Sequence, residues 1–238
     1  MCARMEQFFT SPIRRYFEVE LPRQGHRKKP WPVLIALHGY EGDKTSMLRL
    51  AGRIADGEMV VISLPWPNQF ILRSPVAKNT ARDRRGARGF RVGFGWGTTY
   101  KVEESHALHQ RDLRTLIDLA ARKYRGDRQR VFLLGFSQAC AYNYRFVFTH
   151  PRAVRGAIAV CGGVPGDWNE NPRYKPARTH VLHIAAKRDV WYPREKNSHF
   201  RRQLAERAAS LDFRFYNSPH KFPRAAIPHI RRWIRKYL

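Results

Sequence analysis

The sequence has few cysteines and no long apolar run. Cys2, Cys140 and Cys161 are an odd number without the spacing of a metal site, so neither a disulfide framework nor a zinc ion is expected. Cys140 and Cys161 lie in apolar stretches and are expected to pack as small buried side chains. No stretch approaches the roughly 18 apolar residues of a membrane-spanning helix. Residues 1–16 also lack the apolar segment of a secretory signal. These absences predict a cytoplasmic protein.

Acidic residues are also scarce. The chain has 19 of them against 45 lysines and arginines, which gives a formal net charge of +26. Such a charge attracts nucleic acid, anionic lipid or acidic substrates. No nucleic-acid-binding motif accompanies it, however. The charge therefore favours a solvated basic surface, and no specific nucleic-acid partner is expected.

The length and apolar content suit one hydrophobic core. The chain has 238 residues, 43% of them apolar, so we expect residues 1–238 to form a single domain. Short runs bounded by Gly, Pro or charge are apolar throughout, which is typical of strands covered on both faces. The clearest runs are 32–37, 59–64, 130–136, 156–161 and 180–186, while 16–21 and 211–216 alternate more and are expected nearer the sheet edges.

Between these runs the apolar period becomes helical. Within 103–124, for example, Leu113, Leu116, Ile117 and Ala120 recur at helical spacing. Further helices are expected over 44–56, 138–149, 193–209 and 223–238. The alternation of strands with helices predicts an α/β fold with a doubly wound, mostly parallel sheet.

One segment, residues 65–100, interrupts this alternation. It is rich in Pro, Gly and Arg, and a connection of that length inside a compact domain is usually functional or disordered. Its aromatic residues favour packing, so we predict a meander that helps to wall a pocket, with Trp66, Phe94 and Trp96 as pocket residues. Its arginines can face an anionic substrate or water, and water is the simpler interpretation. They are Arg82, Arg84, Arg85, Arg88 and Arg91.

The strongest candidate for a reactive residue is Ser137. In Gly135-Phe136-Ser137-Gln138-Ala139 an apolar strand leads into a serine flanked two residues away on each side by a small residue, and a helix follows. This is the context of a nucleophile elbow, in which bulkier residues would collide in the sharp turn. The strand ending at Leu37 leads into His38-Gly39-Tyr40, a turn that can present a backbone N–H to an oxyanion. The backbone amides of Tyr40 and Gln138 are therefore the predicted oxyanion hole.

The candidate acid and base also follow strands. Asp189 comes after the 180–186 run, where an acid can orient an imidazole, and Asp167 in the preceding strand-end loop is its competitor. We favour Asp189, because it lies one strand further on and still precedes His220 in the loop before the last helix. His180, His183 and His229 lie within a strand or helix, and the pair His106 and His109 is interpreted as a solvated helix face. The order Ser137, Asp189, His220 is that of a known hydrolase fold.

These residues resemble the α/β-hydrolase superfamily, and within it the phospholipase/carboxylesterase group of acyl-protein thioesterase-like enzymes. The likeness rests on Leu-His-Gly-Tyr at 37–40, Gly-Phe-Ser-Gln at 135–138, Arg-Asp-Val at 188–190 and His220. The chain departs from the group at three places. The group usually has Gly-Gly or Gly-Ala after the Gln, where this chain has Ala139-Cys140. Residues 184–189 lack the group's His-Gly pair, and Pro219 stands where the group has Gly before the histidine.

The resemblance implies a serine esterase that cleaves a small carboxylic ester or thioester through an acyl-enzyme on Ser137, with no metal and no cofactor. Two other interpretations stay open at this point. One is an inactive hydrolase fold that binds nucleic acid or another polyanion through its basic surface. The other concerns the terminal helix, whose apolar face and basic flanks suit either a membrane surface or packing on the sheet; packing is favoured.

Overall fold

A central sheet organises the part of the chain that the computed structural model describes, residues 5–23, 29–73 and 90–238. Its seven strands lie in the order β1-β3-β2-β6-β7-β8-β9. Every neighbouring pair is parallel except the edge pair β1 and β3, which is antiparallel. The strands are β1 (Glu18–Glu20), β2 (Trp31–Leu37), β3 (Val60–Ser63), β6 (Gly126–Phe136), β7 (Gly156–Val160), β8 (His180–Arg188) and β9 (Ser210–Pro219). The predicted mostly parallel α/β sheet, with its two edge strands, is confirmed.

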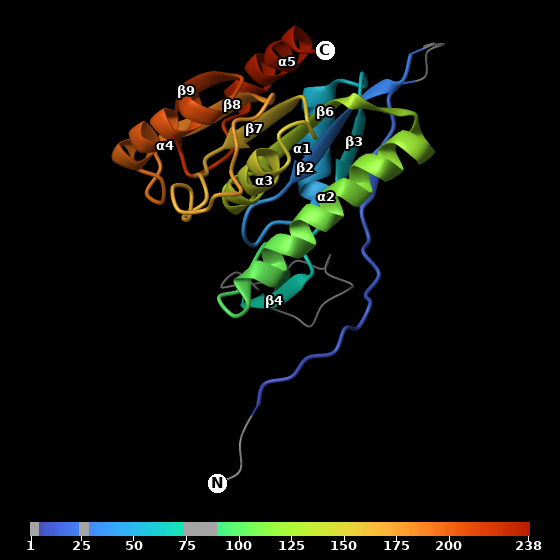
Figure 1. The fold of residues 1–238 in the computed structure, drawn as a ribbon. Helices are drawn as coiled ribbons and strands as arrows, with labels where there is room; N and C mark the ends of the chain where they lie inside the picture. Colours follow the sequence, from blue (N-terminus) through green and yellow to red (C-terminus); the bar gives the residue numbers. More distant parts are fainter. Residues whose placement is uncertain (1–4, 24–28, 74–89) are drawn as a thin grey trace.

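Helices cover both faces of this sheet (Figure 1). They are α1 (Lys44–Ala55), α2 (Val102–Tyr124), α3 (Gln138–Thr149), α4 (Arg194–Arg207) and α5 (Ile227–Lys236), with a short 3-10 turn at Arg224–Ala226. Successive strand residues point to opposite faces, so Ile35 packs with α2 and α3 while Leu34 packs with α1 and α5. This two-sided burial explains why the central strands are apolar at every position. All five predicted helices are confirmed.

The terminal helix α5 packs against the protein, as the sequence analysis favoured. Ile230, Trp233 and Ile234 are buried in the same apolar cluster as α1 and the sheet. Its basic face also makes contacts, because Arg231 pairs with Asp56 at 2.8 Å and Arg235 with Glu58 at 3.0 Å. The apolar stripe is therefore already occupied by the core. No helix in the described ranges is long and apolar enough to span a bilayer.

The 65–100 segment contains a hairpin that the sequence did not indicate. Strands β4 (Asn68–Arg73) and β5 (Phe90–Gly95) pair antiparallel and form a separate two-stranded sheet. In Figure 1, β4 and the N-terminal end of α2 appear at the same end of the molecule. The expected solvated arginines Arg82, Arg84, Arg85 and Arg88 lie outside the described residues, as does the Arg91 side chain.

The prediction of a solvated histidine pair on α2 is wrong for His109. Its ring is buried, with its centroid 5.4 Å from that of Trp96 and 5.3 Å from that of Tyr142. Burial lowers the pKa of His109 to about 3, so the ring is neutral at physiological pH. The segment after β5 brings Trp96 over this face of the helix, and no local period could reveal that long-range contact.

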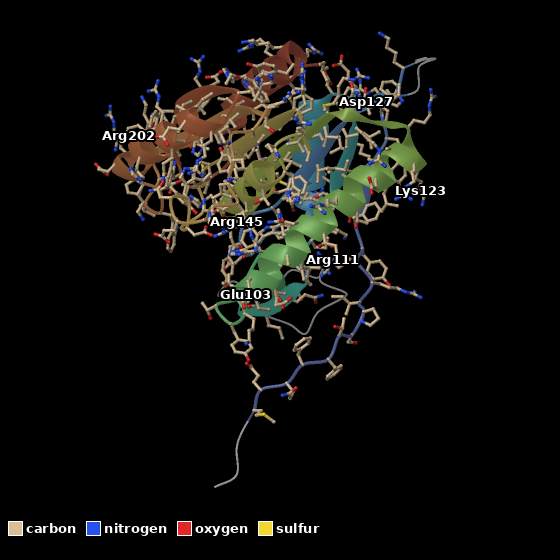
Figure 2. The ribbon with its side chains drawn as sticks, in the orientation of Figure 1. Glu103, Arg111, Lys123, Asp127, Arg145 and Arg202 are labelled. Atoms are coloured by element: carbon tan, nitrogen blue, oxygen red, sulfur yellow. The ribbon has the colours of Figure 1, made fainter. Side chains whose placement is uncertain are left out.

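Basic side chains cover the outer surfaces of the helices. Figure 2 shows the labelled Lys123 on α2 and Arg202 on α4 projecting from the protein, and both are exposed. Arg145 on α3 differs, because it is half-buried and paired with Asp167. A solvated basic surface without a specific nucleic-acid partner stays a prediction.

The sheet register brings the carboxyl ends of the central strands to one edge. Leu37 of β2 pairs with Gly135 of β6, and Phe136 of β6 pairs with Val160 of β7. Next along the sheet, Arg188 of β8 pairs with Pro219 of β9. The residues that follow these strands therefore meet at the same edge, as open α/β sheets require.

Candidate active site

Ser137 occupies a sharp turn between β6 and α3. Its backbone has φ 53° and ψ −118°, a conformation that L side chains rarely adopt and that costs about 1–3 kcal/mol. Its N–H donates a 2.9 Å hydrogen bond to the carbonyl oxygen of Val160, which holds the turn against β7. A Cβ at Gly135 would lie 2.8 Å from Nδ2 of Asn143, so a larger residue there would collide with α3. The turn therefore needs the small residue that the sequence supplies.

A chain of hydrogen bonds links Ser137, His220 and Asp189. The serine Oγ lies 2.9 Å from Nε2 of His220, and Nδ1 of the same ring lies 2.7 Å from Oδ2 of Asp189. A carboxylate only accepts, so Nδ1 carries the proton and Nε2 is free to accept the serine hydroxyl. The side chain of Asp189 is fully buried and that of His220 is 21% exposed. The structure thus brings together the three residues that the sequence analysis selected.

Backbone amides hold the Asp189 carboxylate in place. Its Oδ1 accepts hydrogen bonds from the N–H groups of Trp191 at 2.9 Å and Tyr192 at 3.0 Å. Oδ2 is left for the histidine, so each oxygen has a defined role. A buried carboxylate with these partners is well suited to orient an imidazole and to stabilise its charged form.

The competing acid, Asp167, lies in a different cluster. It pairs with Arg145 at 2.7 Å and accepts hydrogen bonds from Asn171 and Tyr174 at 2.9 and 3.1 Å. Burial alone would raise the pKa of Asp167, but the hydrogen bonds from Arg145 and Asn171 outweigh it and lower the pKa to about 2. These interactions give Asp167 a structural role.

Residues 38–42, the 38–42 loop, follow β2 and approach the serine closely. A Cβ added to Gly39 would lie 2.8 Å from Cδ1 of Phe136 and 3.1 Å from Cβ of Ser137, so only glycine allows this approach. Within the described part of the chain, the Tyr40 amide makes no hydrogen bond, and neither does the Gln138 amide at the start of α3. The first amides of a helix have no partner inside the helix and favour negative charge. Both predicted oxyanion donors are therefore available.

Trp96 joins the two segments that carry these amides. Its indole Nε1–H donates a 2.5 Å hydrogen bond to the carbonyl oxygen of His38, and its backbone N–H donates a 2.9 Å bond to Oε1 of Gln138. The amide of Glu41 adds a third link by donating to the carbonyl oxygen of Phe94 at 3.0 Å. The segment that ends the hairpin thus holds the 38–42 loop beside the start of α3. The sequence did not indicate this arrangement.

The prediction that Trp66 and Trp96 line a pocket is wrong. Their exposed fractions are 1% and 0%, so neither ring offers surface to a ligand, and their centroids lie 5.1 Å apart in the core. Two buried indoles of this size remove a large apolar area from water, which favours their place in the core. Phe94 is half-buried against the core, and its part in a pocket stays a prediction.

The 38–42 loop is also braced by a residue that the sequence analysis did not select. His38 is buried, and its Nδ1–H donates a 2.7 Å hydrogen bond to the carbonyl oxygen of Gly39. The same oxygen accepts the Gly42 amide at 3.0 Å, which closes the turn. Burial lowers the pKa of His38, so its ring is neutral at physiological pH. The sequence signals were its position directly after a buried strand and its place in the Leu-His-Gly-Tyr motif at 37–40.

The two cysteines in the described ranges are free and buried, as predicted. Cys161 follows β7 close to the triad, and its Sγ lies 3.5 Å from the carbonyl oxygen of Lys221. Burial raises the pKa of its thiol to about 12, so it is not a thiolate nucleophile. Across residues 5–23, 29–73 and 90–238, no three His, Cys, Asp or Glu side chains cluster as metal ligands would.

No family model matches the chain, and no curated protein matches it. Solved structures do: a Bacillus cereus carboxylesterase is 20% identical with a TM-score of 0.67 and covers 94% of this chain and 95% of its own. The esterase PE8 is 15% identical with a TM-score of 0.69, over 95% of this chain and 100% of its own.

A third structure extends the same likeness. A phospholipase/carboxylesterase from Dyadobacter fermentans is 16% identical with a TM-score of 0.65, over 93% of this chain and 97% of its own. The likeness to all three runs almost from end to end of both chains. Together with the parallel sheet and its covering helices, it shows that this chain has the α/β-hydrolase fold.

Proposed function

We propose that the protein is a serine hydrolase that cleaves a carboxylic ester or thioester of a small molecule through an acyl-enzyme on Ser137. One observation carries this proposal: the hydrogen-bonded chain from Ser137 through His220 to the buried Asp189, set at the ends of parallel strands. Structures of carboxylesterases and an esterase share the fold, which supports the same class of reaction.

In the first half of the reaction the Ser137 Oγ attacks the carbonyl carbon while Nε2 of His220 takes the hydroxyl proton. The carbonyl π electrons move onto oxygen, and the amides of Tyr40 and Gln138 donate to that oxyanion. The tetrahedral intermediate then collapses, the bond to the leaving alcohol or thiol breaks, and His220 donates its proton to the leaving atom. Asp189 holds the imidazole in the tautomer that these steps require.

In the second half, water replaces the departed group. His220 takes one proton from the water as its oxygen attacks the acyl carbon, and a second oxyanion forms between the same two amides. Collapse of this intermediate breaks the bond to Oγ, His220 returns the proton to Ser137, and the carboxylic acid leaves. These steps need only the triad and the two amides.

A fluorophosphonate carrying a fluorescent group tests the proposal directly, because it phosphonylates an activated serine. The native protein should be labelled, whereas the Ser137→Ala variant and the heat-denatured protein should not. p-Nitrophenyl acetate should be hydrolysed by the native protein, and the same substitution should abolish that hydrolysis. A folded native protein that is neither labelled nor active would contradict the proposal.

A further inference from the structure

An apolar cavity of about 180 Å³ opens beside the 38–42 loop. Gly39 and Tyr40 form one side of it, and Met47 and Leu50 of α1 form another. Phe136 and Phe222 are also part of its lining. Neither face of the hairpin β4-β5 contributes to it in the described part of the chain, so this cavity is distinct from the pocket that the sequence analysis expected around Trp66 and Trp96.

The cavity adjoins the reacting groups. Phe136 directly precedes Ser137, and its ring centroid lies 5.4 Å from that of His220. Phe222 is two residues beyond His220, with its ring centroid 6.3 Å from that of Phe136. A Cβ added to Gly39 would lie 3.1 Å from Cβ of Ser137, so the loop side of the cavity is close to the serine. The cavity is therefore lined by residues that adjoin Ser137 and His220.

The polar groups in the lining disfavour an anionic occupant. Asp43 caps α1, and its carboxylate accepts hydrogen bonds from the N–H and the hydroxyl of Ser46 at 2.7 and 2.9 Å. Its pKa is lowered, because hydrogen bonds from Ser46 outweigh the opposing effect of burial, so it carries a negative charge that repels an anion. His38 is neutral, as described above. The remaining walls are apolar, so binding there is favoured by the removal of an apolar group from water.

We propose that this cavity binds a neutral apolar group of the ester, about the size of a benzene ring or an unbranched chain of about six carbons. The size follows from the volume, because a cavity of about 150 Å³ with an apolar lining holds one benzene molecule. This inference rests on the proposed function, and it makes α1 the element that selects the substrate. Leu50 is then a specificity-determining residue, because it is half-buried and faces the cavity from the middle of the helix.

The test measures kcat/KM for two series of esters. The first varies the acyl chain from acetate to decanoate on p-nitrophenol, and the second varies a straight-chain alcohol on acetate, followed with a pH indicator. In one of these series kcat/KM should rise by up to about fourfold per methylene, the limit for full burial, and stop rising near six carbons. The series that shows the rise identifies whether the acyl or the alcohol part enters the cavity.

Two substitutions at one position then change the cavity in opposite directions. Leu50→Phe fills it and should lower the ratio of kcat/KM for the six-carbon ester to that for the two-carbon ester by about tenfold or more. Leu50→Ala enlarges it and should move the optimum to a longer chain. Leu48→Phe is the matched control, because Leu48 is half-buried on the same helix but does not line the cavity, and it should leave the ratio unchanged.

Each ratio is measured within one variant, and the fraction of active enzyme is titrated with the fluorophosphonate, so partial unfolding does not change the result. Wild-type length profiles in both Leu50 variants, for both series, would overturn the subsite while leaving the proposed hydrolysis intact. A folded wild-type protein that hydrolyses no ester in either series would instead overturn the proposed function and the subsite with it.

Discussion

The indole nitrogen of Trp96 lies 2.5 Å from the carbonyl oxygen of His38 and donates a hydrogen bond to it. The backbone N–H of the same residue donates to the side chain of Gln138. Trp96 therefore connects the two segments whose amides we assign to the oxyanion hole, although it touches neither amide. Because the distance between these amides decides how well they bind a developing oxyanion, Trp96 is a positioning residue in the proposed mechanism.

Replacing Trp96 by Phe removes this hydrogen bond and keeps an aromatic ring in the core. We expect kcat for p-nitrophenyl acetate to fall by about tenfold to a hundredfold, with KM changed by less than about threefold, because the lost positioning acts on the transition state. Trp66→Phe is the control, since its indole nitrogen is buried without a hydrogen-bond partner in the described chain. Equal losses of kcat in the two variants would assign Trp96 to packing alone.

Adding a methyl group at Gly39 should displace the 38–42 loop from Ser137. The new Cβ would lie within 3.1 Å of both Phe136 and Ser137, so the loop and the serine must move apart. For Gly39→Ala we expect kcat/KM to fall by about a hundredfold or more, because misplaced donors lose most of their effect. Gly166→Ala is the control, since a Cβ there would meet nothing within 4 Å, and it should keep wild-type activity. A fully active Gly39→Ala variant would contradict the placement of the oxyanion hole.

The acid of the triad can be tested with an isosteric change. Asp189→Asn keeps the shape of the side chain but replaces an acceptor by a donor beside Nδ1 of His220, which favours the wrong tautomer. We expect kcat to fall by about a thousandfold or more. The same change at the competing Asp167 should leave kcat within about threefold of the wild type, because Asp167 bonds to Arg145 and not to the triad. Steady-state kinetics of the two variants decide between the two acids, and a larger loss at Asp167 would reverse our assignment.

Asp167 should affect stability in a defined pH range. Its pKa in the folded protein is about 2, below its ordinary value of 3.8, so the ionised form stabilises the fold above about pH 4. This contribution is lost as the pH falls from about 4 to about 2. The Tm of Asp167→Asn should therefore be a few degrees below that of the wild type at pH 5–7, and the two should converge near pH 2.

Glu170→Gln provides the comparison for that titration. Glu170 is exposed on the same loop and has no ion pair within the described part of the chain, so its substitution should hardly move the Tm at any pH. Thermal unfolding followed by circular dichroism over pH 2–7 gives all three curves. A gap between Asp167→Asn and the wild type that does not change with pH would show that the lost contacts, and not the charge, set the stability.

Local patterns in the sequence were enough to predict the sheet, its helices and three residues, Ser137, His220 and Asp189, that the structure joins by hydrogen bonds. Strands buried on both faces are apolar at every position, and a serine between small residues after such a strand has few structural alternatives. Because parallel strands end at one edge, the order of Ser137, Asp189 and His220 along the chain already implied that they meet. The structure adds the distances, and it separates Asp189 from Asp167 through their different partners.

The hairpin, the buried His109 and the part played by Trp96 were decided only by the tertiary structure. A hydrogen bond from Trp96 to His38 joins residues 58 positions apart, and no periodicity records which distant carbonyl an indole will reach. The same is true of the cavity at Leu50, whose walls come from α1 and from residues at or just beyond the ends of β2, β6 and β9. The sequence by itself determined the elements and the candidate residues at their ends, because those depend on neighbouring residues. Packing decided the shape of the site, because shape depends on contacts that form only when the whole chain is folded.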